Sequence, residues 1–288
     1  MPPIIVTLTT IPERFNGVHS ETEHGMISNI DSLLNQVFEG EYEIHLNIPD
    51  VLKYTGEAYI IPQWLLDRER DNPKLKLFRG VADMGPITKL YHTVMRTSDP
   101  EAIIIVCDDD LVYDPRMVAE QVKNQETYVN TVCGYDGSRA DDTHWMAKDC
   151  SDDPFYFDVR NHFVVSVYKD VDVNFLQHYK TVSYRRSFFG EDFQDFIREF
   201  CDPETFSGWN DDITVGAYMH KNGIKEIVRC FDGEEKLITL EQWQEKGGVL
   251  SFPVIRHIAR GGEDGCYRYR RDNLEYQYSE YVKRGYLR

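Results

Sequence analysis

The feature that most limits how this chain can fold is an apolar run that ends in three aspartates. Residues 103–107 read IIIVC, and Asp108, Asp109 and Asp110 follow without a break. A continuous apolar run of this kind is typical of a strand buried on both faces at the centre of a parallel sheet. Ligands of open α/β sheets bind just beyond the carboxyl ends of strands, so the aspartates occupy the expected place of a site.

Three adjacent carboxylates repel one another, and a positive partner is needed to offset that repulsion. A divalent cation that carries a diphosphate would supply the charge. The alternative interpretation is a solvated acidic turn, with Asp114 capping a helix that begins at Pro115. The tripeptide by itself leaves both interpretations open.

The sequence around this run predicts an α/β fold. Strands are predicted at residues 4–10, 44–48 and 75–78, the second from alternating apolar and polar residues. Apolar residues at helical spacing predict intervening helices, at residues 26–37, 62–70, 86–95 and 115–128. This alternation is typical of βαβ units and predicts a mainly parallel sheet flanked by helices.

After about residue 130 the pattern loosens. Residues 132–156 contain glycines and an acidic run, and they are predicted to form a long functional or mobile loop. Strand character returns at residues 156–168 and 226–230, with helices predicted to end near Phe200 and Gly223. The sequence contains no repeat, linker or evident boundary, so a single domain over residues 1–288 is expected.

The net charge argues against two classes of partner. The chain has 32 lysines and arginines against 49 aspartates and glutamates, a formal net charge of −17. Nucleic acids and anionic membranes are bound through basic surfaces, so neither partner is expected.

The cysteines and the apolar runs predict a soluble, cytoplasmic protein. The six cysteines are widely spaced and include no C-x-x-C pair, which is typical of reduced thiols. Residues 4–6 are too short for the core of a signal peptide, and no apolar run reaches the length of a membrane span. The sequence leaves the oligomeric state open.

A lysine in the first turn of a predicted helix is a second unusual feature. Residues 83–90 read DMGPITKL, which places Lys89 near the positive end of the helix dipole. A lysine is favourable there only if it faces an anion. The alternative interpretation is a solvated surface lysine.

Five motifs, in this order, resemble those of glycosyltransferases with the GT-A fold. They are TLTTIPER at residues 7–14, GPITKL at 85–90, DDD at 108–110, WNDDI at 209–213, and the late histidine His257. The resemblance covers nearly the whole chain and extends to the soluble glycosyltransferases of large algal (chlorella) viruses. It implies a Rossmann-like, mainly parallel sheet flanked by helices, with a smaller antiparallel portion on the acceptor side.

The resemblance also implies a metal site and a donor site. Asp110, Asp108 and His257 would bind Mn²⁺ or Mg²⁺, and the imidazole suits Mn²⁺ better. The alternative for His257 is a structural histidine near an arginine. A nucleotide sugar, expected to be a UDP-sugar such as UDP-xylose or UDP-glucose, would be lined by several of the motif residues: Thr9, Arg14, Asp83, Lys89, Asp108 and Asp109.

Asp211 and Asp212 lie where another helix is predicted to begin. In one interpretation they cap the helix and interact favourably with its dipole. In the functional one, which the other motifs favour, one of them is the general base for the acceptor hydroxyl, with Asp211 ahead of Asp212. A single base serves an inverting transferase because the metal stabilises the departing diphosphate, so inversion is expected. Aromatic residues could provide sugar-stacking platforms or belong to the core: Trp145, Phe188, Phe189 and Trp209.

The predicted function is therefore metal-dependent transfer of a sugar from a nucleotide sugar to a carbohydrate acceptor. Residues 1–130 would bind the donor, and residues 131–288 the acceptor, with a tyrosine- and arginine-rich tail as a lid. One alternative is a phosphatase or phosphotransferase with Asp108 as nucleophile, although such enzymes usually carry their Asp-x-Asp on the first strand. Another is a non-catalytic metal-binding module. The chain lacks the P-loop and dinucleotide-binding fingerprints.

Overall fold

The structure is a computed structural model that describes residues 1–15, 25–53, 55–138, 163–164, 170–200, 211–229, 254–257, 281 and 283–286. The apolar run forms the strand β6 (Ile103–Val106) near the middle of the main sheet. Ile104 and Val106 pack into the core on one face, and Ile103 and Ile105 into the core on the other. The strand is thus buried on both faces, as its sequence predicts.

The main sheet has eight strands in the order β11-β14-β8-β13-β6-β1-β2-β5. β6, β1, β2 and β5 are mutually parallel, β8 and β14 are parallel to each other, and β13 runs antiparallel between β6 and β8. The strands other than β6 are β1 (Ile4–Thr9), β2 (Glu43–Pro49), β5 (Leu75–Val81), β8 (Thr131–Gly134), β11 (Val171–Asp172), β13 (Val182–Arg185) and β14 (Lys225–Val228).

Three small antiparallel sheets accompany the main one. The three-stranded sheet has the order β10-β9-β12, and two pairs are formed by β7 with β15 and by β3 with β4. Their bounds are β3 (Val51–Leu52), β4 (Glu57–Ala58), β7 (Leu111–Tyr113), β9 (Gly137–Ser138), β10 (Phe163–Val164), β12 (Phe175–Leu176) and β15 (Val254–His257). The predicted α/β class, with a mainly parallel sheet and a smaller antiparallel portion, is confirmed.

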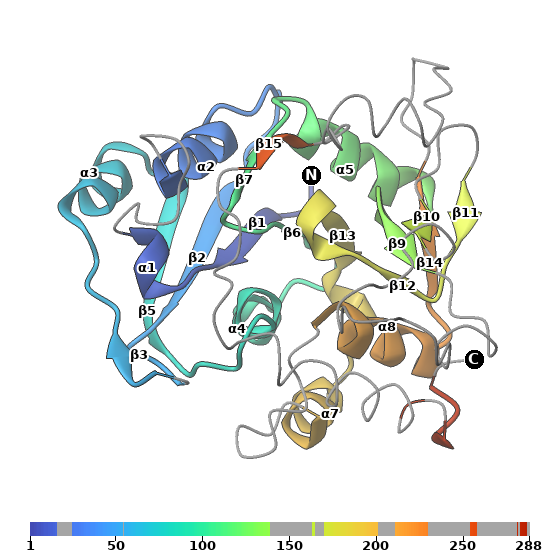
Figure 1. The fold of residues 1–288 in the computed structure, drawn as a ribbon. Coiled ribbons are helices and arrows are strands. Elements are labelled where there is room, and N and C mark those ends of the chain that lie inside the picture. Colours follow the sequence, from blue (N-terminus) through green and yellow to red (C-terminus); the bar gives the residue numbers. More distant parts are fainter. Residues whose placement is uncertain are drawn as a thin grey trace, which may run out of the picture.

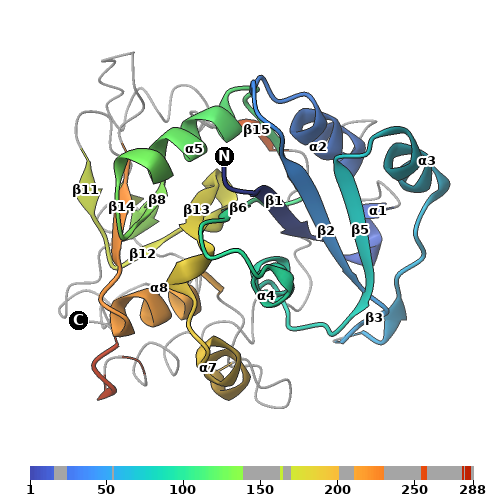
Figure 2. The same ribbon diagram turned by 180° about the vertical axis from the view of Figure 1, so that it is seen from behind.

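Helices cover both faces of the main sheet, so the molecule has three layers (Figures 1 and 2). One face packs against α2, α3 and α5, and the other against α4, α7 and α8. The helices are α1 (Pro12–Phe15), α2 (Gly25–Leu34), α3 (Gln63–Asp71), α4 (Thr88–Arg96), α5 (Met117–Thr127), α7 (Phe193–Phe200) and α8 (Asp211–Lys221). Two 3₁₀ turns, η1 (His178–Lys180) and η2 (Arg186–Phe188), flank β13.

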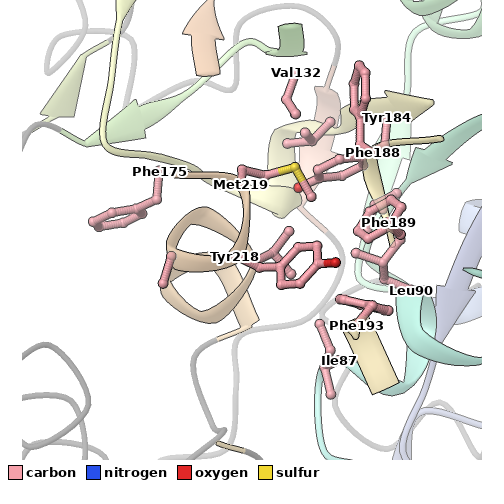
Figure 3. Close-up of a cluster of buried hydrophobic side chains, with 14 of the residues drawn as sticks. Ile87, Leu90, Val132, Phe175, Tyr184, Phe188, Phe189, Phe193, Tyr218 and Met219 are labelled. Carbon is pink, nitrogen blue, oxygen red and sulfur yellow. The ribbon is translucent and has the colours of Figure 1, made fainter. Parts of the chain in front are cut away.

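The core under α4, α7 and α8 is rich in aromatic rings (Figure 3). The Tyr218 ring of α8 packs edge-on against Phe193, with 5.0 Å between the centroids, and stacks with Phe189 at 6.2 Å. Phe188 and Phe189 are 7% and 2% exposed, so both belong to this core and are not sugar-stacking platforms. Trp145 and Trp209 lie outside the described residues.

Two strands differ from their sequence patterns. In β2 the polar residues of the alternating pattern, His45 and Asn47, are 5% and 0% exposed, because helix α4 covers the face that alternation would leave to water. The Asn47 amide donates hydrogen bonds to Thr7 Oγ1 and to the Lys89 carbonyl, which satisfies it in the core. The region predicted to be a loop contains the fully buried strand β8. The prediction missed this strand because four residues are too few to show a period.

The described part of the carboxyl-terminal tail packs against α7 and α8. Tyr281 is buried, lies 4.7 Å from Phe200 between ring centroids, and donates a hydrogen bond to Thr214 Oγ1 at 3.1 Å. The rest of the predicted lid lies outside the described residues. Within the described part of the chain, every helix falls short of the length and apolarity needed to span a bilayer.

Arg186 is predicted to fix the position of α4, the helix that carries Lys89. Its Nε donates to the Val94 and Thr97 carbonyls at 2.9 and 2.8 Å, at the carboxyl end of that helix. Arg186→Met removes these bonds and leaves the Val94 carbonyl with its 3.3 Å bond from the Thr97 N–H, so we expect a loss of about 1–3 kcal/mol in the free energy of unfolding. Urea unfolding followed by circular dichroism measures this loss.

The matched control is Arg70→Met on α3. Among the described residues the exposed Arg70 pairs with Asp67 and Asp71 of its own helix, so we expect a much smaller loss than in Arg186→Met. Equal losses in the two variants would show that Arg186 does not fix α4.

Candidate functional site

The three aspartates lie where β6 ends and the chain turns into β7. Asn29 of α2 donates from Nδ2 to the carbonyls of Asp108 and Leu111, at 2.8 and 2.7 Å. The Tyr113 hydroxyl accepts the Asp108 N–H at 2.8 Å. Asn29 and Tyr113 are buried, so the acidic side chains project from a backbone that the core holds in place.

Arg14 of α1 neutralises two of the three carboxylates. It forms ion pairs with Asp109 and with Asp110, the second at 3.2 Å between Nη2 and Oδ2. Burial raises the pKa of Asp109 to about 6, although the Arg14 charge opposes that rise. The acids therefore do not form a freely solvated turn, because an internal cation accompanies them.

Lys89 joins the strand-end acids to the acids at the start of α8. Its Nζ lies 2.6 Å from Asp108 Oδ1 and 2.8 Å from Asp211 Oδ2, and its side chain is 6% exposed. Burial alone would lower the pKa of Lys89, but the two carboxylates outweigh it and raise the pKa. Lys89 is therefore a buried ammonium, and Asp108 and Asp211 are the anions that a first-turn lysine requires.

The loop before α4 determines where Lys89 lies. Gly85 has a φ of +69°, which favours glycine, and its N–H donates to Asp83 Oδ1 at 2.8 Å. Thr88 Oγ1 accepts the Met84 N–H at 2.9 Å and so ties this loop to the first residue of the helix. α4 begins at Thr88, two residues later than Pro86 suggests, and Lys89 remains in its first turn.

His178 contacts both acids of α8. Its ring Nδ1 lies 2.7 Å from Asp211 Oδ2 and 3.0 Å from Asp212 Oδ1, and its backbone N–H donates to Asp212 Oδ1 at 3.0 Å. Burial alone would lower the pKa of His178, but Asp211 and Asp212 outweigh it and raise the pKa to about 9. The histidine is therefore an imidazolium at neutral pH.

The two acids of α8 have different surroundings. Burial alone would raise the pKa of Asp211, but Lys89 and His178 hold it below its usual range. The Asp211 side chain is 10% exposed and that of Asp212 is 22%. Asp212 Oδ2 accepts no hydrogen bond from the described residues, so Asp212 is the more accessible of the two carboxylates.

His257 is brought beside the acidic turn by strand pairing. β15 runs antiparallel to β7, and His257 lies opposite Leu111, the residue after Asp110. Segments nearly 150 residues apart in sequence thus meet at this point. The register of β15 on β7 places the His257 backbone and the acidic turn at the same end of this two-stranded sheet.

Thr9 and Asp83 make other contacts. Thr9 Oγ1 donates to the Asn47 carbonyl at 2.8 Å, and the Asp83 carboxylate accepts the N–H groups of Lys53 and Gly85, both at 2.8 Å. Nearby, the Tyr59 hydroxyl donates to the Thr10 carbonyl at 3.0 Å, and burial and the charges of Asp83 and Asp109 raise its pKa. Thr9 and Asp83 are therefore engaged by neighbouring backbone and border the cluster.

Sequence reasoning missed several residues of this cluster. His178, Asn29 and Tyr59 occur in no motif, and only the folded chain brings them to the acids. Glu226 of β14 was missed as well, because it falls inside a short strand; burial raises its pKa to about 8. The one sequence signal for Glu226 was an acidic residue at the start of a predicted apolar strand.

His178, Asp211 and Asp212 also form a group with metal-like spacing. Their candidate ligand atoms lie within 4.8 Å of one another. The Lys89 ammonium already lies 2.8 Å from Asp211 Oδ2, and His178 is itself a cation. A metal would have to displace both charges, so we assign none to this group.

No protein-family model and no curated protein matches the chain. Among solved structures, the mannosyltransferase PcManGT from Pyrobaculum calidifontis, in complex with GDP-Man and Mn²⁺, aligns at a TM-score of 0.51 and 11% identity. That alignment covers 98% of this chain and 64% of the mannosyltransferase. The 2-C-methyl-D-erythritol 4-phosphate cytidylyltransferase of Francisella tularensis aligns at 0.43 and 10% identity, over 86% of this chain and 98% of that one.

The chain has a GT-A-like fold. At 11% identity, the likeness to the mannosyltransferase establishes the architecture and leaves the activity to be argued from the site. The chain spans 64% of that enzyme's length.

Lys89 is predicted to stabilise the fold as well as the site. Lys89→Met removes the ammonium shared by the half-buried Asp108 and the buried Asp211, which keeps His178 as a partner, so we expect a loss of about 3 kcal/mol in the free energy of unfolding. Adding Asp211→Asn removes one of those charges, and the double variant is expected to be more stable than Lys89→Met alone. Urea unfolding of all four members of this cycle measures the coupling.

The control is Lys221→Met on α8. Lys221 pairs with Asp192, whose side chain is 51% exposed, so we expect a loss below about 1 kcal/mol. Additive effects of Lys89→Met and Asp211→Asn would contradict the proposed bridge.

Glu226 and His178 are predicted to make stability fall as pH rises. The folded pKa of Glu226, about 8, exceeds its ordinary value of 4.5, and that of His178, about 9, exceeds 6.5. The folded state therefore binds more protons than the unfolded state between these values. The free energy of unfolding should fall with pH, with a slope of up to about 1.4 kcal/mol per pH unit for each proton.

The isosteric variant Glu226→Gln separates the two groups. It stays neutral, so its stability should fall less steeply than that of the wild type between pH 6 and pH 8. Urea unfolding at pH 6, 7, 8 and 9 measures both slopes, with exposed Glu57→Gln as the control. Parallel curves for the wild type and Glu226→Gln would rule out a buried, neutral Glu226.

Proposed function

We propose that the chain is a metal-dependent glycosyltransferase that moves a sugar from a nucleotide sugar to a carbohydrate hydroxyl. One observation carries the proposal: the Lys89 ammonium joins Asp108, at the end of β6, to Asp211, at the start of α8. Acids for donor binding and acids for acceptor activation thus meet at the carboxyl end of the central strands, where α/β sheets bind ligands. The GT-A-like fold supports the proposal, since the mannosyltransferase that shares it binds GDP-Man and Mn²⁺.

The residues at the acidic turn suit a divalent cation. Asp108 and Asp110 offer carboxylate oxygens, and His257, beside them by register, offers an imidazole, a mixed set that fits Mn²⁺ better than Mg²⁺. The bound metal would supply positive charge to the diphosphate and stabilise it as it departs. Asp108, Asp110 and His257 are the ligands we propose, and Lys89 and Arg14, which now pair with Asp108 and Asp110, would move to the donor phosphates when the metal binds.

Two cations of the chain would bind the donor phosphates. Arg14, now paired with Asp109 and Asp110, presents a planar guanidinium that matches phosphate oxygens, and Lys89 adds a second charge. Thr9, Asp83 and Asp109 border the same region and are proposed to line the nucleotide. A UDP-sugar remains our expected donor, and the GDP-Man of the structural neighbour makes GDP-sugars the first comparison.

The contacts favour Asp212 over Asp211 as the general base. Lys89 and His178 hold the pKa of Asp211 below its usual range, which makes its carboxylate a weak proton acceptor. Asp212 is more exposed and keeps one oxygen without a hydrogen bond among the described residues. We propose that Asp212 takes the acceptor proton, that Asp211 holds Lys89, and that the single base gives inversion.

The first test is binding of nucleotides with and without metal. UDP, GDP and CMP are each added with Mn²⁺ or with EDTA, and the melting temperature is recorded. We expect a nucleoside diphosphate to stabilise the protein only with Mn²⁺, and Asp110→Asn to abolish that shift. Asp114→Asn is the control, because the Asp114 carboxylate pairs with Arg116 and not with Arg14 or Lys89. The absence of any nucleotide-dependent shift would contradict the proposal.

The second test is turnover of UDP-glucose, UDP-xylose and GDP-mannose with a panel of glycan acceptors. Asp212→Asn should lower kcat by about 10²–10⁴-fold and leave nucleotide binding unchanged. Asp211→Asn should disturb binding as well, because it removes the charge of one of the two carboxylates that hold Lys89. Hydrolysis of a phosphomonoester by the wild type, lost in Asp108→Asn, would favour the phosphatase alternative. Metal binding without turnover of any donor would favour the non-catalytic module.

A further inference from the structure

The His178 side chain belongs to no motif, yet it is the most fully enclosed charged group of the cluster. It is 1% exposed and begins the turn η1, between β12 and β13. Its ring reaches Asp211 and Asp212 through Nδ1, and Tyr184 through Nε2 at 2.7 Å from the hydroxyl. Both ring nitrogens are therefore engaged, each on a different side of the imidazole.

The turn that carries His178 is fixed by contacts on three sides. The Gln177 N–H donates to the Asp136 carbonyl at 2.9 Å, and the Tyr113 hydroxyl donates to the Tyr179 carbonyl at 3.1 Å. Thr181 closes the turn with a φ of 65°, a backbone conformation that is unfavourable for threonine. A residue held in such a conformation requires support from its surroundings, so the position of the turn is imposed by the fold.

Tyr184 links the histidine to the apolar core. Tyr184 is 1% exposed and packs on Phe189, with ring centroids 5.5 Å apart (Figure 3). Its hydroxyl is the hydrogen-bond partner of His178 Nε2. The imidazole is thus held between a rigid aromatic cluster and the acids of α8.

The acids themselves need such a partner. Asp211 and Asp212 are adjacent on α8, and their like charges repel one another. Lys89 reaches Asp211, whereas the contacts of Asp212 with the described residues come from the His178 ring and backbone N–H, both to Oδ1. These contacts leave Asp212 Oδ2 without a hydrogen bond from the described residues.

We propose that His178 is a positioning residue, which orients the Asp212 carboxylate toward the acceptor hydroxyl by holding Oδ1 from two directions. This inference rests on the proposed function, in which Asp212 is the general base. It gives His178 no direct contact with donor or acceptor. Removing it should therefore affect the transfer step and leave donor binding nearly unchanged.

Three substitutions distinguish positioning from simple packing. In His178→Asn the amide nitrogen can take the place of Nδ1, so the contact with Asp212 can persist. In His178→Gln the amide can reach Tyr184 in place of Nε2, and His178→Leu removes both contacts. We expect kcat to fall about 10–100-fold in His178→Leu and His178→Gln and to recover most of that loss in His178→Asn, because small misplacements of a catalytic group cost about this much. The KM for the donor should stay within about 2-fold.

Tyr184→Phe serves as the folding control, because it removes the Nε2 partner and keeps the core ring. Melting temperatures of all variants, measured beside the kinetics, show whether loss of activity follows loss of stability. If kcat falls only in proportion to the folded fraction, or if Asn and Gln behave alike, the inference is overturned.

A structural readout decides the inference even if the wild type turns over no nucleotide sugar, the result that would overturn the proposed function. Crystal structures of His178→Leu and His178→Asn report the Asp212 side chain directly. We expect a changed Asp212 rotamer in His178→Leu and the original one in His178→Asn. An unchanged carboxylate in His178→Leu would overturn the inference, whatever the activity of the protein.

Discussion

The site depends on one buried ammonium. Lys89 lies between a strand-end aspartate and a helix-start aspartate, and no other described cation reaches both. Without it the acids of β6 and α8, whose like charges repel one another, would lose the cation that they share. The position of Lys89 is set by its own carbonyl, bound by Asn47, and by the glycine turn before α4. The polar residues buried in β2 thus support a charge at the end of the sheet.

The features that could be predicted from the sequence are those that depend on local residue patterns. The apolar run of β6, the first-turn position of Lys89 and the acids at the start of α8 follow from periodicity and from helix-start residues. Their convergence follows from a general property of parallel sheets, in which strand ends and helix starts share one edge. The fold class could therefore be predicted from the sequence, and so could the edge of the sheet at which the candidate site lies.

The rest depended on contacts between distant residues. His178 lies 33 residues from Asp211, in a turn whose shape depends on Thr181 and Tyr113, so no spacing rule points to it. Whether Asp211 or Asp212 is the better proton acceptor also depends on tertiary contacts, because Lys89 approaches only one of them. Short strands such as β8 and β13 show too few residues for a period, and their place in the sheet is set by their neighbours.

The antiparallel strand β13 has a consequence for how the chain acquires its structure. It covers the edge of β6 opposite β1, and it is made nearly eighty residues after β6. Until then a run of isoleucines presents unpaired backbone amides and carbonyls, an edge that other chains can join. A nascent chain that ends before residue 182 therefore carries an exposed, aggregation-prone edge beside the acids of the candidate site. Addition of β13 to the sheet and protection of the β6 edge are the same event in this molecule.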